Sequence, residues 1–390
     1  MRSGLDRIAA GEPEAVGRVR GRSVGLVAHP ASVDAHLRHA RDVLVDGGAE
    51  VGALFGPEHG YGGEAQDMVG VRSARDPRTG APIHSLYGER EEDLAPRPEW
   101  LDGLDAMVVD LQDVGSRYYT YVWTAALVLR TAAARGIPTV VLDRPNPLGG
   151  DRVEGAPQRP GYRSFVGLYD VAVRHGMTLA ELLELVRHRE GLPPEALEVV
   201  PMAGWQRRMR WEDTGLPWVA PSPNMPTPDT ARVYSGGCLL EGTLLSEGRG
   251  TTRPFEIWGA PSLDGVALAR ALRIEGAVLR PLTFQPMFQK HAGRVCGGVQ
   301  VHVTDAERFR PYAAYLRWIA EARRLMSETF RWRTEPYEFV SDRPAIDLLT
   351  GGPEYRQVVD RDGDLEGLLA EDARAAAAFD ETRRPFLRYP

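Results

Sequence analysis

The stretch AMVVDLQDVGSRYYTY, residues 106–121, opens with a short valine-rich apolar run and then turns polar. An apolar run of about four to eight residues bounded by such a change is typical of a buried strand in a parallel sheet. Three other runs have the same character: SVGLVAH (23–29), EVGALF (50–55) and TVVLD (139–143). Helical stretches near 33–46 and 119–135 alternate with these runs, and another helix follows Thr178, its N-cap. This alternation predicts a doubly wound parallel sheet of the Rossmann-like α/β class.

Polar residues follow each of the four predicted strands. The exits are His29-Pro30, GPEHG at 56–60, DLQD at 110–113 and DRPNP at 143–147. In open α/β sheets, ligands bind beyond the carboxyl ends of the strands, where the loops converge. We therefore expect the four exits to form one site.

The length of the chain predicts two domains. It has 390 residues, 43% of them hydrophobic, whereas a single domain usually has about 100–200 residues. The proline-rich tract 212–230 predicts a junction, with a Rossmann-like catalytic domain at 1–205 and an α+β domain at 206–390 completing the cleft. The second domain contains a strand-like segment at 296–305 and an amphipathic helix around 306–328.

Composition excludes several classes of partner. The net charge of −7 and the lack of a basic stripe argue against nucleic acid. Cys238 and Cys296 have no metal or disulfide spacing, which predicts two small buried side chains, no metal and no cofactor. The chain shows neither an apolar leader nor a run of about 18 apolar residues, so we expect a cytoplasmic protein with no membrane insertion. A homo-oligomer is compatible with this composition.

The motif GPEHGYGG presents Glu58 and His59 on a constrained backbone. Pro57 fixes one dihedral angle, and the surrounding glycines let the main chain approach a ligand closely. An ordinary turn in which Glu58 caps a neighbouring amide is the alternative. The position at a strand exit favours a functional carboxylate.

The third strand is followed by a second set of candidates. Asp113 and Arg117 lie four residues apart, and Tyr118 and Tyr121 come directly after them. A surface ion pair and core tyrosines would explain the same pattern. Phenols, an arginine and an aspartate at a sheet edge also suit a ligand that carries hydroxyls or a carboxylate.

The remaining candidates come from two glycine-rich loops. LDRPNPLGG supplies Asp143 and Asn146, and a simple loop stop is the alternative for Asn146. EGTLLSEGRGT supplies Glu241, Glu247 and Arg249. A solvated hairpin would account for Glu241, whereas Arg249 would hold Glu247 ionised or oriented.

Taken together, these motifs resemble the exo-β-N-acetylmuramidase family of glycoside hydrolases over about residues 20–385. The resemblance rests on GPEHGYGGEAQDMVG, TGAPIHSLYG, DLQDVGSRYYTY, LDRPNPLGG, HGMT, SPNMP, EGTLLSEGRGT and KHAGRVCGGVQVHVTD. It implies an enzyme that removes N-acetylmuramic acid from the non-reducing end of peptidoglycan fragments, such as MurNAc-GlcNAc or muropeptides. It also implies Glu58 as the leading catalytic carboxylate, and the motifs HGMT and SPNMP add His175 and Asn224 as substrate-binding candidates.

Glycosidase chemistry agrees with this assignment. Hydrolysis needs an acid at the leaving oxygen and a second group at the anomeric centre, and two carboxylates normally supply them. Glu58 is our candidate general acid and base. Glu247 and Asp113 are both candidates for the second carboxylate, and a 2-acetamido group could itself be the nucleophile.

The other groups would bind the sugar. The lactyl carboxylate of muramic acid needs a cation, for which Arg117 and Arg249 are candidates. Tyr118 and Tyr121 would stack on the sugar or donate to it. Two other functions remain as alternatives: a non-catalytic muropeptide-binding protein, and a nucleotide-dependent Rossmann oxidoreductase. The oxidoreductase would need GxGxxG after the first strand, where this chain has AHPASVD.

Overall fold

A seven-stranded sheet forms the first part of the molecule. The structure, a computed structural model, describes residues 1–66, 68–70 and 74–390. The strands have the order β3-β4-β2-β1-β5-β6-β7, and all neighbours are parallel except β3 and β4. Their bounds are Ser23–Ala28 (β1), Glu50–Gly56 (β2), Ala74–Arg75 (β3), Pro82–Ser85 (β4), Ala106–Asp110 (β5), Thr139–Leu142 (β6) and Leu197–Val200 (β7).

The order of the parallel strands is that of a Rossmann-like fold. Without β3, the strands run third, second, first, fourth, fifth and sixth in chain order, so the topology switches between β1 and β5. Ala28 at the end of β1 pairs with Asp110 at the end of β5. The two strands therefore open at the same level, and the predicted doubly wound sheet is confirmed.

In the described part of the chain, five helices accompany this sheet, and one of them begins well after its predicted start. They are α1 (Gly4–Ala9), α2 (Pro13–Val16), α3 (Ala40–Asp46), α4 (Tyr121–Ala134) and α5 (Leu179–Arg189). The helix expected from residue 33 starts at Ala40, because Asp34 Oδ1 accepts the N–H groups of His36 and Arg38 at 2.9 Å and holds a turn there. The expected N-cap of α5 is confirmed: the Thr178 side chain accepts from Glu181 N.

The second, smaller domain has an antiparallel sheet in the order β8-β10-β9. Its strands are β8 (Ile257–Ala260), β9 (Ala277–Phe284) and β10 (Cys296–Val303). The helices beyond β7 are α6 (Trp211–Thr214), α7 (Pro228–Gly237), α8 (Gly265–Ala271), α9 (Pro311–Met326), α10 (Ala345–Thr350), α11 (Glu354–Asp360) and α12 (Leu365–Arg383). The helix predicted from residue 306 begins at Pro311, since proline has no N–H to lose at a first helical position. Both cysteines are free and buried, as predicted.

Short 3₁₀ helices complete the secondary structure. They are η1 (Glu91–Leu94), η2 (Pro98–Leu101), η3 (Pro160–Tyr162), η4 (Pro194–Ala196), η5 (Cys238–Gly242) and η6 (Arg384–Phe386). Within the described ranges, every helix is too short or too polar to cross a membrane.

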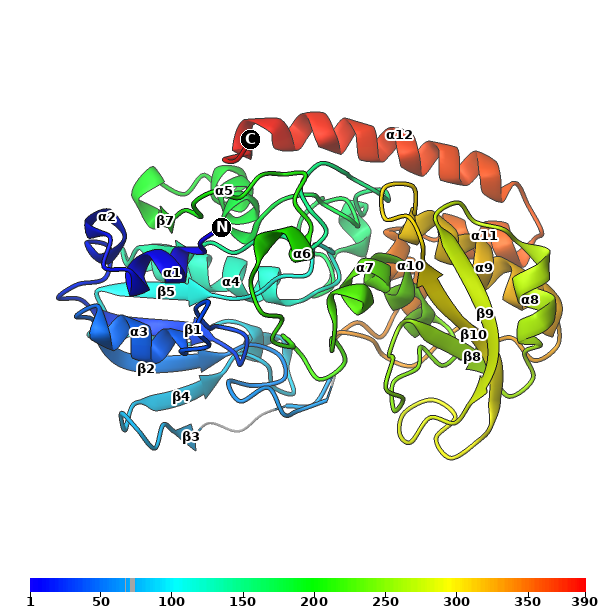
Figure 1. The fold of residues 1–390 in the computed structure, drawn as a ribbon, viewed down its shortest axis with the longest axis horizontal. Helices are drawn as coiled ribbons and strands as arrows, with labels where there is room; N and C mark the ends of the chain where they lie inside the picture. The colour runs from blue at the N-terminus through cyan, green and yellow to red at the C-terminus, as the bar shows by residue number, and fades with distance from the viewer. Residues whose placement is uncertain (67, 71–73) are drawn as a thin grey trace.

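The C-terminal helix ties the two parts together. α12 extends from the second domain across the molecule, and the chain ends beside α5 of the first (Figure 1). There Arg383 donates to Gly150 O at 2.8 Å, and the Tyr389 hydroxyl donates to Asp143 Oδ2 at 2.6 Å. These bonds anchor the end of the chain to the Rossmann-like domain.

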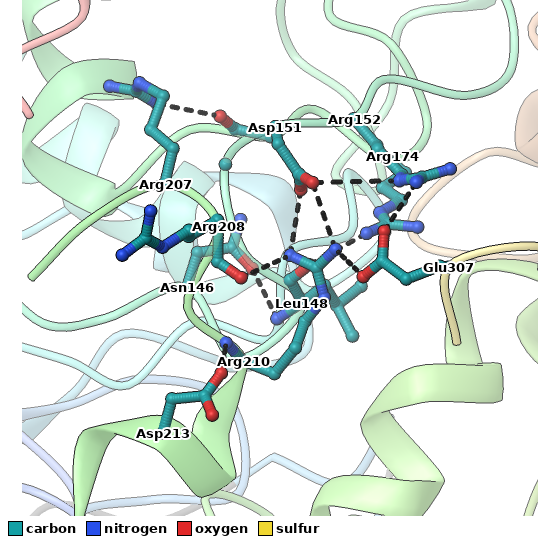
Figure 2. A network of polar contacts seen from close by, with 12 residues as sticks. Asn146, Leu148, Asp151, Arg152, Arg174, Arg207, Arg208, Arg210, Asp213 and Glu307 are labelled. Atoms are coloured by element: carbon teal, nitrogen blue, oxygen red, sulfur yellow. Dashed lines mark hydrogen bonds and ion pairs between the residues drawn. The ribbon is translucent and has the colours of Figure 1, made fainter. Parts of the chain in front are cut away.

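An ionic network makes a second connection. Figure 2 shows Arg210 between Asp151 and Glu307, and Glu307 lies just before α9 of the second domain. Arg210 Nη2 donates to Glu307 at 2.8 Å, and Arg152 Nη2 donates to the other oxygen of Glu307 at 2.6 Å. Two arginines beside the Rossmann-like sheet thus hold one carboxylate of the second domain.

Candidate active site

Glu58 lies in the loop directly after β2, near the switch point of the sheet. Gly56 is required at the start of this loop, since a Cβ there would lie 2.2 Å from Tyr61 N. The Glu58 side chain is only 6% exposed. Thr120 Oγ1 donates to its Oε2 at 2.7 Å, and Met68 N donates to its Oε1 at 3.2 Å. Both donors are neutral groups.

His59 stabilises the same loop. It has a φ of 70°, a left-handed conformation that is rare outside glycine. Its Nδ1 lies 2.8 Å from Ala65 O, and because a carbonyl only accepts, Nδ1 carries the proton. The ring thus closes the loop that carries Glu58, while its edge faces Tyr121.

The loop of the SPNMP motif lies against the Glu58 loop. Asn224 Nδ2 donates to Gln66 Oε1 at 2.9 Å. Tyr121 donates to Pro221 O at 2.7 Å, which holds the same segment from the α4 side. The structure therefore brings Asn224 and Tyr121 to the side of Glu58.

Asp113 and His175 form a buried pair beyond β5. His175 Nε2 lies 3.3 Å from Asp113 Oδ2, and His175 Nδ1 accepts from Met177 N at 3.1 Å. Gly115 N also donates to Asp113 Oδ2 at 2.8 Å. The other oxygen, Oδ1, is buried with no hydrogen-bond partner in the described residues. A buried acceptor without a partner is costly unless a ligand completes it.

Arg117 and Tyr118 lie in the interior, contrary to the prediction that they contact substrate. The Arg117 guanidinium donates to backbone carbonyls at Ala156, Val171 and Leu349, and burial lowers its pKa. Tyr118 packs under the guanidinium, 5.3 Å from ring centroid to Cζ. Since Leu349 belongs to α10, Arg117 joins the two domains and is not available to a sugar carboxylate.

Asp143 and Asn146 also have structural partners. Asp143 accepts from Thr178 Oγ1, Ala180 N and Tyr389, so it caps α5 and anchors the chain end. Burial raises its pKa to about 6. Asn146 bridges Met177 O and Leu148 N. Both side chains are buried and occupied by these bonds, and the substrate-binding role predicted for them stays a prediction.

The glycine-rich loop of the second domain carries a compact charge cluster. Glu247 is 1% exposed and accepts from Lys290 Nζ at 2.8 Å, while Arg249 Nε lies 3.3 Å away. Burial acts to raise the pKa of Glu247, but the charges of Lys290 and Arg249 outweigh it and hold the pKa below its ordinary value. Glu241 accepts from Arg249 and from Tyr337, each at 2.7 Å.

A row of aromatic rings connects the two clusters. The ring contacts are His59–Tyr121 (6.5 Å), Tyr121–Tyr119 (4.7 Å), Tyr119–Tyr234 (5.9 Å) and Tyr234–Phe255 (4.8 Å), and Arg249 lies 5.1 Å from the Phe255 ring. The charges of Asp113 and Glu58 both act on the Tyr119 hydroxyl, whose pKa is raised first by burial. The row therefore has the loop of Glu58 and His59 at one end and the charge cluster of Glu247 and Arg249 at the other.

Several residues of the site were not selected from the sequence. Thr120 and Tyr119 stand in the motif YYTY beside the tyrosines that were chosen, and a helix start leaves open which side chain faces the loop. Lys290 lies 43 residues from Glu247, so no local pattern announces the pair. His29 is a buried neutral histidine: burial, aided by the Arg144 charge, lowers its pKa to about 3.

Comparison with known proteins matches the whole chain. The model for the N-terminal part of exo-β-N-acetylmuramidase NamZ covers residues 24–229, and the C-terminal model covers 232–389. The peptidoglycan β-N-acetylmuramidase NamZ of Bacillus subtilis (strain 168) is 39% identical over 393 aligned residues, covering 100% of this chain and 91% of the relative.

Two solved structures share the fold. Both are DUF1343 family proteins from Bacteroides fragilis NCTC 9343. The first has a TM-score of 0.89 at 30% identity and the second a TM-score of 0.76 at 26% identity; both alignments cover 100% of this chain, and 99% and 98% of the respective structures. The resemblance found in the motifs is thereby confirmed: the chain belongs to the exo-β-N-acetylmuramidase NamZ family of glycoside hydrolases.

Proposed function

We propose that this enzyme releases N-acetylmuramic acid from the non-reducing end of peptidoglycan fragments such as MurNAc-GlcNAc, with Glu58 as general acid and base. The main support is the position of Glu58: its carboxyl is nearly buried, lies near the switch point of the sheet and accepts hydrogen bonds from Thr120 and Met68. The name of the Bacillus subtilis relative, a peptidoglycan β-N-acetylmuramidase, supports the substrate class.

The partners of Glu58 suit a group that must gain and lose a proton. Neither donor is a cation, so neither commits the carboxyl to the anionic form. The Thr120 hydroxyl donates to a carboxylate, and it can rotate to accept from the same oxygen once that oxygen is protonated. A general acid in glycoside hydrolysis passes through both states in each cycle.

We assign the second catalytic role to Asp113 in preference to Glu247. Asp113 Oδ2 is held by Gly115 N and approached by His175, while Oδ1 has no partner in the described residues. We infer that an acetamido N–H or the positive charge at the anomeric centre completes this buried oxygen when substrate is bound. Glu247 has a cation beside each of its oxygens, which suits a fixed anion.

Arg333 is our candidate for the lactyl carboxylate. Its guanidinium lies 3.8 Å from Met68 Sδ, and Met68 is the residue whose N–H donates to Glu58. Arg333 has no acidic partner in the described part of the chain; its guanidinium donates to Pro336 O and Met68 Sδ and lies over the Tyr337 ring. Arg249, the earlier candidate, is occupied by Glu241 and Glu247.

The test compares para-nitrophenyl N-acetylmuramide with the N-acetylglucosaminide. The wild type should release nitrophenol from the muramide only. Glu58→Gln should lower kcat by about 10²–10⁴-fold, the usual contribution of a general acid. Glu64→Gln, an exposed glutamate of the same loop, is the matched control and should keep wild-type activity. Equal activity of Glu58→Gln and wild type would refute the assignment of Glu58, and preference for the glucosaminide would refute the substrate.

A further inference from the structure

A cavity lies in the C-terminal domain, next to the loop that carries Glu247. It has a volume of about 400 Å³. Its walls come from the 244–245 segment, the end of β8, the β9–β10 hairpin and the end of α9. Its lining includes Leu244, Leu245, His291, Arg294, Phe330 and Arg331.

The lining carries cationic or protonatable groups but no carboxylate. His291, Arg294 and Arg331 lie at the cavity, and neither aspartate nor glutamate is among its walls. In the described ranges, Arg294 and Arg331 form no ion pair; Arg331 donates only to the carbonyls of Glu328 and Phe330. Buried Leu245, Met326 and Phe330 form an apolar floor. Such a cavity suits a ligand with an apolar face and a negative charge.

The cavity is joined to the proposed active site through one loop. Lys290 donates to Leu245 O and to Glu247, while its neighbour His291 lies 2.7 Å from Leu244 O. Glu247 thus lies at one end of this loop, and Leu244 and Leu245 at its other end line the cavity. Leu244, at the cavity end of this loop, is 40% exposed.

A short extended segment makes the second connection. Leu244 N donates to Arg331 O, and Arg333 N donates to Gly242 O, so these two segments pair around Trp332. Residues two apart on extended backbone point to the same side. Arg331 at the cavity and Arg333 beside Met68 therefore form a basic row that leads from the cavity to the Glu58 loop.

We propose that this cavity binds the lactyl carboxylate of a second muramic acid residue, further along the glycan chain than the bond that is cleaved. This inference rests on the proposed function and extends it from a terminal sugar to a chain. In alternating MurNAc and GlcNAc, carboxylates recur at every second sugar. Arg294 and Arg331 take the carboxylate, and the apolar floor takes the sugar face or the acetamido methyl group.

The experiment measures kcat and KM on two substrates that differ in length. One is para-nitrophenyl N-acetylmuramide, which has no second carboxylate; the other is the tetrasaccharide MurNAc-GlcNAc-MurNAc-GlcNAc. Arg294→Ala/Arg331→Ala should raise KM for the tetrasaccharide at least tenfold and change KM for the nitrophenyl substrate less than twofold. Arg270→Ala/Arg374→Ala removes two exposed arginines elsewhere and should change neither.

A third substrate identifies the charge that is recognised. A tetrasaccharide with the second lactyl carboxylate converted to its methyl amide should show the raised KM with wild type and no further rise with the double variant. Equal effects of the double variant on long and short substrates would overturn the inference while leaving the proposed function intact. If wild type cleaves neither substrate, the proposed function fails, and calorimetric titration of Glu58→Gln with the tetrasaccharide and its amide still tests the cavity.

Discussion

Glu58 and Glu247 are both buried glutamates on glycine-rich loops, yet their surroundings are opposite. Glu58 follows a strand of the Rossmann-like sheet and receives bonds from a hydroxyl and an amide. Glu247 belongs to the second domain and lies between Lys290 and Arg249. The hydrogen-bond donors of the first are neutral, whereas the cations beside the second stabilise its ionised carboxylate.

The comparison shows that burial alone does not identify a catalytic carboxylate. The kind of partner decides: neutral donors that can also accept suit proton transfer, and cations suit a fixed charge. Asp113 is intermediate: Gly115 N donates to its Oδ2, whereas its Oδ1 has no partner among the described residues. Three substitutions test this division, beginning with the largest expected effect.

Lys290→Met should break the charge cluster of the second domain. Removing one partner of a buried ion pair leaves a charge incompletely compensated, which typically costs about 3–5 kcal/mol. Because Arg249 stays beside Glu247, we expect the free energy of unfolding to fall by about 3 kcal/mol, near the lower end of this range, as measured by urea unfolding. Lys290→Met/Glu247→Gln should recover part of it. A stability equal to that of wild type would show that the cluster is not a structural anion site.

Thr120→Val should affect catalysis with little change in stability. A hydrogen bond to an ionised group contributes about 1.5–3 kcal/mol, so kcat should fall roughly 10–100-fold. The alkaline limb of the pH–rate profile should move as well, since a general acid must be protonated to act and Thr120 contacts its carboxyl. Thr120→Ser keeps the hydroxyl and should restore both. If serine fails to restore the pH profile, Thr120 acts only by packing.

Glu247→Gln should have the smallest effect of the three substitutions, a change in how the free energy of unfolding depends on pH. The folded-state pKa of Glu247 is below its ordinary value of 4.5, so folding favours the ionised carboxylate. This contribution is fully present above about pH 4.5 and is lost as the pH falls through the folded-state pKa. The stability advantage of wild type over Glu247→Gln should therefore shrink between pH 6 and pH 3. An advantage that is constant over this range would contradict the ionised state assigned to Glu247.

Much of the fold was readable from local patterns. Apolar runs gave the positions of β1, β2, β5 and β6, because strands buried on both faces must be apolar throughout. The early start expected for α3 was wrong, since Asp34 bonds its own neighbouring backbone and holds a turn. A domain boundary at residue 205 stays a prediction.

The site was only partly readable, because motifs mark which residues matter without saying what they touch. Of the aspartates that follow the strands, Asp113 has one buried oxygen without a partner in the described residues, while Asp143 caps α5 and contacts Tyr389. Both are acids at strand exits, and nothing within a few residues of either distinguishes them. Nothing in the motif YYTY indicates that the Thr120 hydroxyl faces Glu58, which lies 62 residues earlier in the chain.

The sequence by itself determined the doubly wound α/β class, the family and Glu58 as the leading carboxylate candidate. These three depend on hydrophobic periodicity and on short motifs whose members are neighbours along the chain. Only the tertiary structure decided the partners. Arg117 reaches Leu349 across 232 residues, and Glu58 reaches Thr120 across 62. The chemistry of a buried charge is set by the groups that folding brings around it, and those groups leave no periodic signal in the chain.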